Sequence, residues 1–314
     1  MQAIAYGLAA SFFFAFTFIL NRSMDLSGGS WIWSASLRFI FMLPMLFVLV
    51  ALRGKLHHSL AHLKQNFMAY LLWSTVGFGL FYAPITLSSS FGEGWLVAGS
   101  WQMTIIAGTL LVPLFRQEMA TPEGVVMVRP KIPFKSLGWS LLILVGVLCM
   151  QIEQASQLSI AQALACLLPV LLAAFMYPLG NRKMMAICHN DVDTFERVLN
   201  MTIGSMPFWL LLSLYGLATD GPPSMGQIEQ SFLVALFSGV IATLLFFAAT
   251  NLVKNDFKKL AAVEATQSGE VLFALLGEIV LLHAPIPASL SLLGIALVIL
   301  GMILHCAAPL LRRR

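Results

Sequence analysis

Long apolar runs separated by short polar gaps dominate the chain. A bilayer core about 30 Å thick needs roughly 20 residues of helix, and ten runs meet that length. Backbone polar groups in lipid must be satisfied within their own segment, and the runs lack the alternation of barrel strands, so we expect helices. The predicted spans are residues 3–20, 31–52, 67–88, 94–115, 135–152, 158–180, 195–218, 231–253, 260–282 and 286–308. The expected fold class is an all-α membrane protein with ten transmembrane helices.

Composition excludes several function classes. The 314 residues are 59% hydrophobic and 10% charged, whereas a soluble domain carries about 25% charged residues. The net charge of +4 includes no concentrated basic patch, so we expect no nucleic-acid partner. The chain has no phosphate-binding loop, GxSxG or HExxH motif, so we expect neither enzyme activity nor a cofactor nor a metal. Its four cysteines lack CxxC spacing and are interpreted as buried thiols.

Basic residues predict the orientation of the chain. Positive charge in short loops stays in the cytoplasm. Of the eighteen Lys and Arg residues, sixteen fall on one side of the predicted threading; only Arg22 lies on the other side, and Arg38 lies inside a run. We therefore expect a multi-pass protein of the cell (inner) membrane with both termini in the cytoplasm.

The two halves of the chain resemble each other weakly. Matching residues follow in the same order in both halves: Asn21 and Asn181, Pro44 and Pro207, Gln102 and Gln267. A five-helix unit has an odd number of spans, so its second copy enters the membrane from the opposite side. Inverted repeats recur among secondary transporters, whose halves rock around a central site. We predict one repeat over residues 1–154 and the other over residues 155–314.

Three segments carry a resemblance to a known family. They are residues 27–38, 177–184 and 259–270, together with Leu276-Gly277-Glu278 near the end of the ninth span. With its ten spans, the chain resembles the drug/metabolite transporter superfamily over nearly its whole length, and specifically the ten-helix, EmrE-like multidrug resistance efflux transporters. The resemblance implies a five-plus-five helix fold and export of small molecules. The four-helix relatives use a glutamate in their first helix; residues 3–20 contain no acid, so that residue is not carried over.

Polar residues in the ninth span are the first site candidates. Glu270 is predicted about 15 Å from the cytoplasmic end, near the membrane midplane, and Glu264 about 6 Å from it. Gln267 shares a helical face with Glu270. Because charge at that depth is costly, Glu270 is interpreted as a proton- or substrate-binding carboxylate. The alternative is a structural glutamate bonded to neighbouring helices, and the side chain of Glu264 can also reach the headgroup layer.

Two further polar residues lie inside predicted spans. Arg38 is predicted about 10 Å below the outer surface, either as a counter-ion to Glu270 or as a structural arginine that extends outward or caps carbonyls freed by Pro44. Gln102 either faces the same cavity as Gln267 or only joins helices.

Aromatic residues and prolines complete the candidates. Tyr82 and Trp101 lie deep enough to stack on flat or cationic ligands, although packing alone would also explain them. Pro44 and Pro207, at matching positions, are candidate hinges.

These observations predict a secondary active transporter with the bilayer and a small-molecule substrate as partners. We expect proton-coupled efflux of small amphipathic or cationic compounds by alternating access. A metabolite or amino-acid exporter of the same fold is the alternative. A polytopic membrane enzyme is a distant one, since acid pairs such as DDxxD and nucleophile motifs are missing and Asp191 and Asp193 are interpreted as loop charges.

Overall fold

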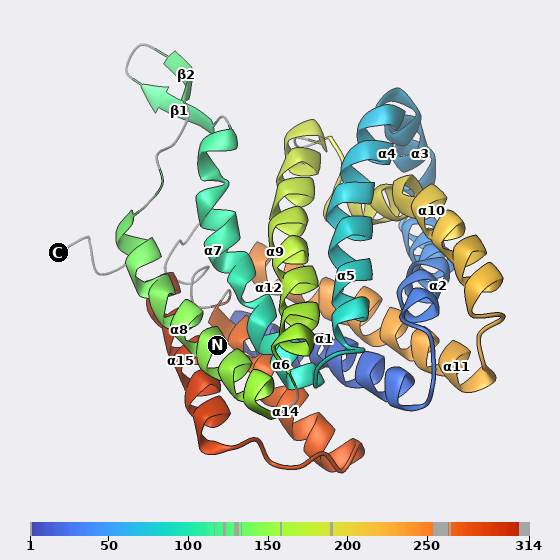
Figure 1. The fold of residues 1–314 in the computed structure, drawn as a ribbon. Helices are drawn as coiled ribbons and strands as arrows, with labels where there is room; N and C mark the ends of the chain where they lie inside the picture. The colour runs from blue at the N-terminus through green and yellow to red at the C-terminus, as the bar shows by residue number, and fades with distance from the viewer. Residues whose placement is uncertain are drawn as a thin grey trace.

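The computed structural model describes residues 2–115, 117–121, 124–128, 132, 134–157, 159–188, 191–253, 263 and 265–307. Helices make up most of this part of the chain (Figure 1). Seven of them are long and apolar enough to cross a membrane, and they overlap seven of the ten predicted spans. Their bounds are Gln2–Leu26, Trp31–Leu52, Phe67–Ser88, Gly138–Ser156, Ile160–Cys188, Thr194–Thr219 and Met225–Thr250.

Four of these spans are single α-helices that run the whole length: α1 (Gln2–Leu26), α2 (Trp31–Leu52), α9 (Ile160–Cys188) and α10 (Thr194–Thr219). A fifth, α8 (Phe134–Gln157), begins before its apolar window. Helices α1 and α9 continue past the predicted ends at residues 20 and 180. They do so because their polar residues find partners: Arg22 pairs with Asp25 at 2.8 Å, and Arg182 donates to the Gly108 carbonyl at 2.6 Å.

Two of the seven spans contain π-helical segments. Residues 67–88 form α4 (Phe67–Ser74), the π-helix η1 (Thr75–Gly79) and α5 (Leu80–Ser88). Residues 225–253 form α11 (Met225–Val234), the π-helix η3 (Ala235–Ala242) and α12 (Thr243–Val253). The two π-helices lie in spans that the sequence repeat predicts to be equivalent. Such segments are rare and occur frequently at functional sites.

The remaining three predicted spans are shorter helices. Residues 94–115 form α6 (Gly94–Trp101), α7 (Met103–Leu110) and the turn η2 (Val112–Leu114), so the expected continuous helix is interrupted at Gln102. The ninth span is described as the 3-10 turn η4 (Thr266–Ser268) followed by α14 (Gly269–Leu281). The last helix, α15 (Ser289–Ala307), begins later than expected because the segment before it contains two prolines.

A short hairpin and a connecting helix lie between the spans. Strands β1 (Gln117–Thr121) and β2 (Gly124–Val128) pair antiparallel, with Gln117 opposite Val128; the sequence did not predict them. Helix α3 (Leu56–Gln65) joins α2 to α4.

Helices far apart in sequence pack as partners. Helix α2 packs along α10 and α8 along α15, while α1 packs against α12 and α14, and α9 packs against α5 and α7. Glycines permit the closest contacts. A Cβ on Gly180 would lie 2.4 Å from the Cα of Gly77, and a Cβ on Gly294 would lie 2.6 Å from the Gly146 oxygen. Backbones that approach this closely are typical of membrane helices.

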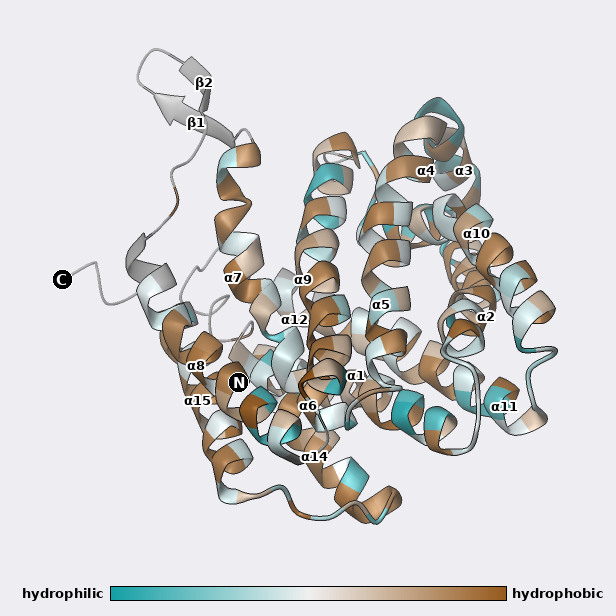
Figure 2. Cartoon of the chain, in the orientation of Figure 1, coloured by the Kyte–Doolittle hydropathy of each residue, from teal (hydrophilic) through white to brown (hydrophobic). Residues whose placement is uncertain are grey.

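Apolar residues predominate along the helices (Figure 2). Large exposed apolar residues occur on most of the helices, for example Leu52 on α2, Leu172 on α9 and Leu211 on α10. A soluble protein rarely exposes contiguous apolar surface on this scale. A bilayer would cover this surface, as expected for a membrane protein.

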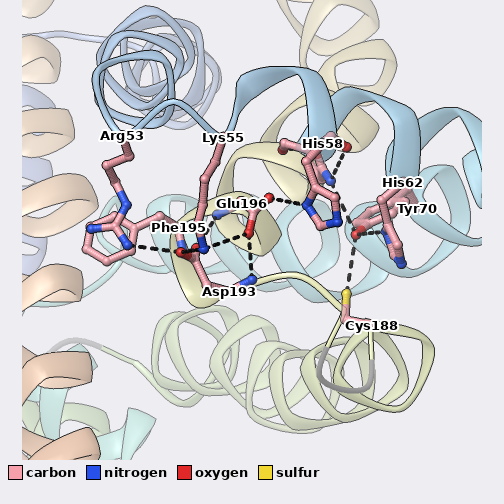
Figure 3. A network of polar contacts seen from close by, with 11 residues as sticks. Arg53, Lys55, His58, His62, Tyr70, Cys188, Asp193, Phe195 and Glu196 are labelled. Atoms are coloured by element: carbon pink, nitrogen blue, oxygen red, sulfur yellow. Dashed lines mark hydrogen bonds and ion pairs between the residues drawn. The ribbon is translucent and has the colours of Figure 1, made fainter.

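Ion pairs join the end of α2 to the start of α10 (Figure 3). Asp193 caps α10 and accepts from Arg53 at 3.0 Å and Lys55 at 2.9 Å. Glu196 completes the capping box and contacts His58 at 2.6 Å between Oε1 and Nδ1. The basic partners come from residues 53–58, and the two acids lie at the start of α10, Asp193 as its N-cap and Glu196 in its first turn. The network therefore ties the two halves of the chain together at this end.

A second part of the network lies beside the first (Figure 3). The Tyr70 hydroxyl lies 3.0 Å from His62 Nδ1 and 3.2 Å from Cys188 Sγ. Asn200 donates to the Ser59 carbonyl at 2.9 Å and accepts from its hydroxyl at 2.8 Å. These bonds fix α3 against α9 and α10.

Candidate functional site

A cavity of about 140 Å³ lies among the helices. Its walls come from α1, α2, the spans containing η1 and η3, α6, α7, α9, α10, η4 and α14, and so from both halves of the chain. It borders both large apolar clusters of the core, one including Phe18 and Ile85, the other Phe39 and Met42. The polar lining residues are Thr17, Arg38, Thr104, Asn181, Arg197, Ser238, Thr243, Gln267 and Glu270.

Glu270 lies in the first turn of α14, directly after η4. Gly269 before it permits close packing on α1, since a Cβ there would lie 2.8 Å from Ser11 Oγ. Glu270 is 5% exposed and lines the cavity together with Gln267. Within the described part of the chain, no hydrogen bond or ion pair engages its carboxylate. A buried carboxylate without a hydrogen-bond or ion-pair partner requires a proton or a bound cation to offset the loss of water.

Arg38 is held in place on the α2 wall of the cavity. It is 7% exposed, its Nη2 donates to Ser238 Oγ at 3.1 Å, and its Cζ lies 4.0 Å from the centre of the Tyr82 ring. Thr17 contacts the Ser238 hydroxyl at 2.5 Å, and Asn21 donates to the Tyr82 hydroxyl at 3.1 Å. No described carboxylate lies within 4.0 Å of the guanidinium. Arg38 therefore neither extends outward nor forms the direct ion pair with Glu270 that was one of its two interpretations.

Three aromatic rings form another part of the wall. Phe81, Trp101 and Tyr177 come from α5, α6 and α9, and all three line the cavity. Their ring centres lie 4.8 to 5.5 Å apart. Aromatic faces attract cations and stack on flat apolar groups, so these rings can hold either kind of ligand.

The cavity unites some predicted site residues and not others. Glu270, Gln267, Arg38 and Trp101 line it. Tyr82 is fully buried behind Arg38 and is not part of the lining. The remaining candidates are Gln102, Glu264, Pro44 and Pro207.

Gln102 does not share the cavity with Gln267. Its Nε2 donates to the Ala98 carbonyl of α6 at 3.3 Å, at the break between α6 and α7. Pro44 and Pro207 lie inside the continuous helices α2 and α10, and their role as hinges stays a prediction. Glu264 lies outside the described residues.

Several lining residues were not singled out as candidates. Tyr177 and Asn181 belong to the segment 177–184 that carried the family resemblance, and Asn181 also matched Asn21 of the repeat, so a signal for both was present. Arg197 was counted only among the sixteen basic residues on one side of the predicted threading. Thr17 and Ser238 are small polar residues in apolar runs, and no local pattern distinguishes them.

A second buried acid, Glu278, serves a different purpose from Glu270. It is 1% exposed, and its two carboxylate oxygens accept the backbone N–H groups of Gly94 at 2.7 Å and Trp95 at 3.1 Å. These are orphan donors in the first turn of α6. Glu278 therefore fixes α14 to the helix that carries Trp101.

The comparisons with known proteins agree with this architecture. Residues 1–309 match the family described as "EmrE: Putative multidrug resistance efflux transporter". "Uncharacterized protein YjlA" of Bacillus subtilis (strain 168) is 54% identical over 308 residues, which are 98% of this chain and 95% of that protein. A protein of Shouchella clausii, printed as "Uncharacterized 42.1 kDa protein in intracellular alkaline protease 3'region", is 46% identical over 270 residues, covering 86% of this chain and 70% of that protein. The chain therefore belongs to the EmrE-like family of multidrug resistance efflux transporters.

Proposed function

We propose that the protein is a secondary active transporter that exports small amphipathic or cationic compounds in exchange for protons. The observation that carries the proposal is the Glu270 carboxylate, which lies in a cavity with three aromatic rings and has no partner among the described residues. A proton and a cationic substrate would compete for this carboxylate, which is the coupling that an antiporter requires. The rings would hold the apolar part of the substrate.

We propose further that ten spans form two inverted five-helix halves with both termini in the cytoplasm of a bacterial cell. The helix contacts support this arrangement, because they are paired as a twofold axis requires. Equivalent helices meet at α2 with α10 and at α8 with α15. The contacts of α1 with η3 and α14 are matched by those of α9 with η1 and α7. The π-helices η1 and η3 lie in equivalent spans, and the helical geometry changes at both Gln102 and Gln267.

Alternating access follows from this symmetry. If the two halves rock, residues of both halves around the cavity change their distance from each other, and the cavity opens first to one side and then to the other. The network that joins residues 53–58 to Asp193 and Glu196 would have to break whenever the cavity opens past it. Reporter tags fused after residues 60 and 220 test the threading, because they must respond from opposite compartments.

Reconstituted vesicles test the proton coupling. With a pH-sensitive dye trapped inside, an amphipathic cation such as ethidium should drive proton movement in the wild type. Glu270→Gln should abolish this signal while still allowing the vesicles to hold a pH gradient. Glu229→Gln is the matched control, since Glu229 lies exposed on α11. Full activity of Glu270→Gln would remove this carboxylate from the mechanism.

A further inference from the structure

The charge on Arg38 has no counter-ion among the described residues. A guanidinium carries five N–H donors. Here Nη2 bonds to Ser238, Nη1 has no hydrogen-bond partner among the described residues, and Nε is fully buried without one. A buried charge normally persists only when it is paired and its donors are satisfied. Arg38 therefore has unused hydrogen-bonding capacity inside a cavity that is large enough for a ligand.

The surroundings of Arg38 fix its guanidinium before any ligand arrives. The ring of Tyr82 lies against its face at 4.0 Å, and Asn21 holds the Tyr82 hydroxyl. Ser238 is in turn held by Thr17. A planar guanidinium that is fixed in this way is suited to bidentate binding of a carboxylate. Because little side-chain freedom is lost on binding, such preorganisation favours affinity.

We propose that Arg38 binds the carboxylate of the transported substrate, and that the substrate is a small zwitterion with an apolar body. This inference rests on the proposed transport function and names its substrate class. Glu270 provides the complementary acceptor for a cationic amine, and the rings of Phe81, Trp101 and Tyr177 accommodate the apolar body beside the charged groups. A cavity of about 140 Å³ is similar to one that holds a benzene-sized group, which sets the scale of that body.

The cavity favours a zwitterion over a simple cation on grounds of charge. A ligand with only a positive charge would share the cavity with Arg38 and would leave its Nη1 without a partner. A ligand with both charges satisfies Arg38 and Glu270 at once. The free energy of burying both groups is then recovered in the bound state, not lost in it.

Three matched probes test this assignment: L-phenylalanine, L-phenylalaninamide, which lacks the carboxylate, and 3-phenylpropionate, which lacks the amine. Binding to the purified protein in detergent can be measured by calorimetry and by thermal stabilisation. We expect L-phenylalanine to bind at least about tenfold more tightly than its amide, the ratio that one charge-assisted hydrogen bond provides. If no carboxylate-bearing probe binds at millimolar concentration, or if the amide binds as tightly as the acid, the assignment is wrong.

Variants of Arg38 test whether this residue causes the difference in affinity between L-phenylalanine and its amide. Arg38→Gln should weaken L-phenylalanine about tenfold or more and leave the amide unchanged. Arg38→Lys keeps the positive charge but lacks the planar guanidinium, so its affinity for L-phenylalanine should lie between those of the wild type and Arg38→Gln. Equal losses for acid and amide would mean that Arg38 acts only through Glu270 or the fold, which would also overturn the proposal. If the amide drives proton exchange and Arg38→Gln does not change the affinity for either ligand, the transport function stands and this assignment alone fails.

Discussion

The carboxylate of Glu278 offers a direct test of how the helices around the cavity are held together. It is almost fully buried and accepts two backbone N–H groups at the start of α6, from Gly94 and Trp95. Only glycine permits this approach, because a Cβ on Gly94 would lie 2.8 Å from the Phe18 carbonyl oxygen and 3.0 Å from Glu278 Oε1. Removing the carboxylate would leave two buried donors without a partner.

The loss of stability expected on removing the Glu278 carboxylate follows from the two hydrogen bonds it accepts. Each hydrogen bond to a charged group contributes roughly 1.5 to 3 kcal/mol, so the loss of two in Glu278→Ala should lower the free energy of unfolding by about 3 to 6 kcal/mol. Glu278→Gln keeps one neutral acceptor oxygen and should therefore lose less than Glu278→Ala. Because α6 carries Trp101, backbone hydrogen exchange should also rise in its first turn.

Unfolding in mixed micelles of SDS and a mild detergent, followed by circular dichroism, measures the free energy. Glu229→Ala, an exposed acid on α11, is the control and should remain within about 0.5 kcal/mol of the wild type. A loss below about 1 kcal/mol in Glu278→Ala would show that the two contacts contribute no more than ordinary neutral hydrogen bonds, and the reasoning would fail.

Two further predictions concern other contacts between helices. Asp193→Ala should lower the free energy of unfolding by about 1 kcal/mol through loss of the α10 cap, whereas Asp193→Asn keeps the cap and should lose less. Partial burial raises the pKa of Asp193. The backbone N–H of Glu196 and the cations Lys55 and Arg53 stabilise the ionised carboxylate and outweigh the effect of burial, so the pKa of Asp193 lies below its ordinary value. The stabilisation is therefore complete above about pH 4 and is lost as the pH falls through the lower folded-state pKa, so acid titration should narrow the difference between the wild type and Asp193→Ala. Gly180→Ala should lower the free energy of unfolding by about 1 to 3 kcal/mol, because the new Cβ would meet the backbone of η1. A Cβ on Gly138 would meet nothing within 4 Å, so Gly138→Ala should leave the stability unchanged or raise it. Comparable melting temperatures for the two variants would contradict the packing argument.

Hydropathy predicted the helical class and the position of seven long spans, because a helix that crosses lipid must be continuously apolar. It did not predict the break at Gln102, since an interruption of one residue hardly changes the average over a window. Hydropathy also did not predict the hairpin of β1 and β2, because the hairpin lies in a polar connection where no membrane constraint applies. The two prolines before α15 were a visible signal for its later start.

The site was predictable where charge was involved. Glu270 and Arg38 were found from the sequence because an ionisable residue inside an apolar run is costly and needs a reason. Tyr177 and Phe81 line the cavity with them, yet each is one aromatic residue among many, and only the packing of α5 against α9 brings the two together. Thr17 and Ser238, more than 200 positions apart, contact each other only because α1 packs on η3.

The π-helices η1 and η3 make the length of these spans as important as their composition. A π-helical turn accommodates one residue more than an α-helical turn. Because the extra residue is taken up within that turn, a single deletion inside Thr75–Gly79 would restore regular geometry and leave the register of α5 nearly unchanged. A single deletion inside α4 would instead rotate α5 by about 100° relative to the start of the span. Phe81 would then turn away from its neighbours, although the segment would stay as apolar as before. Loss of one codon could therefore change what the protein carries and leave its insertion into the membrane intact.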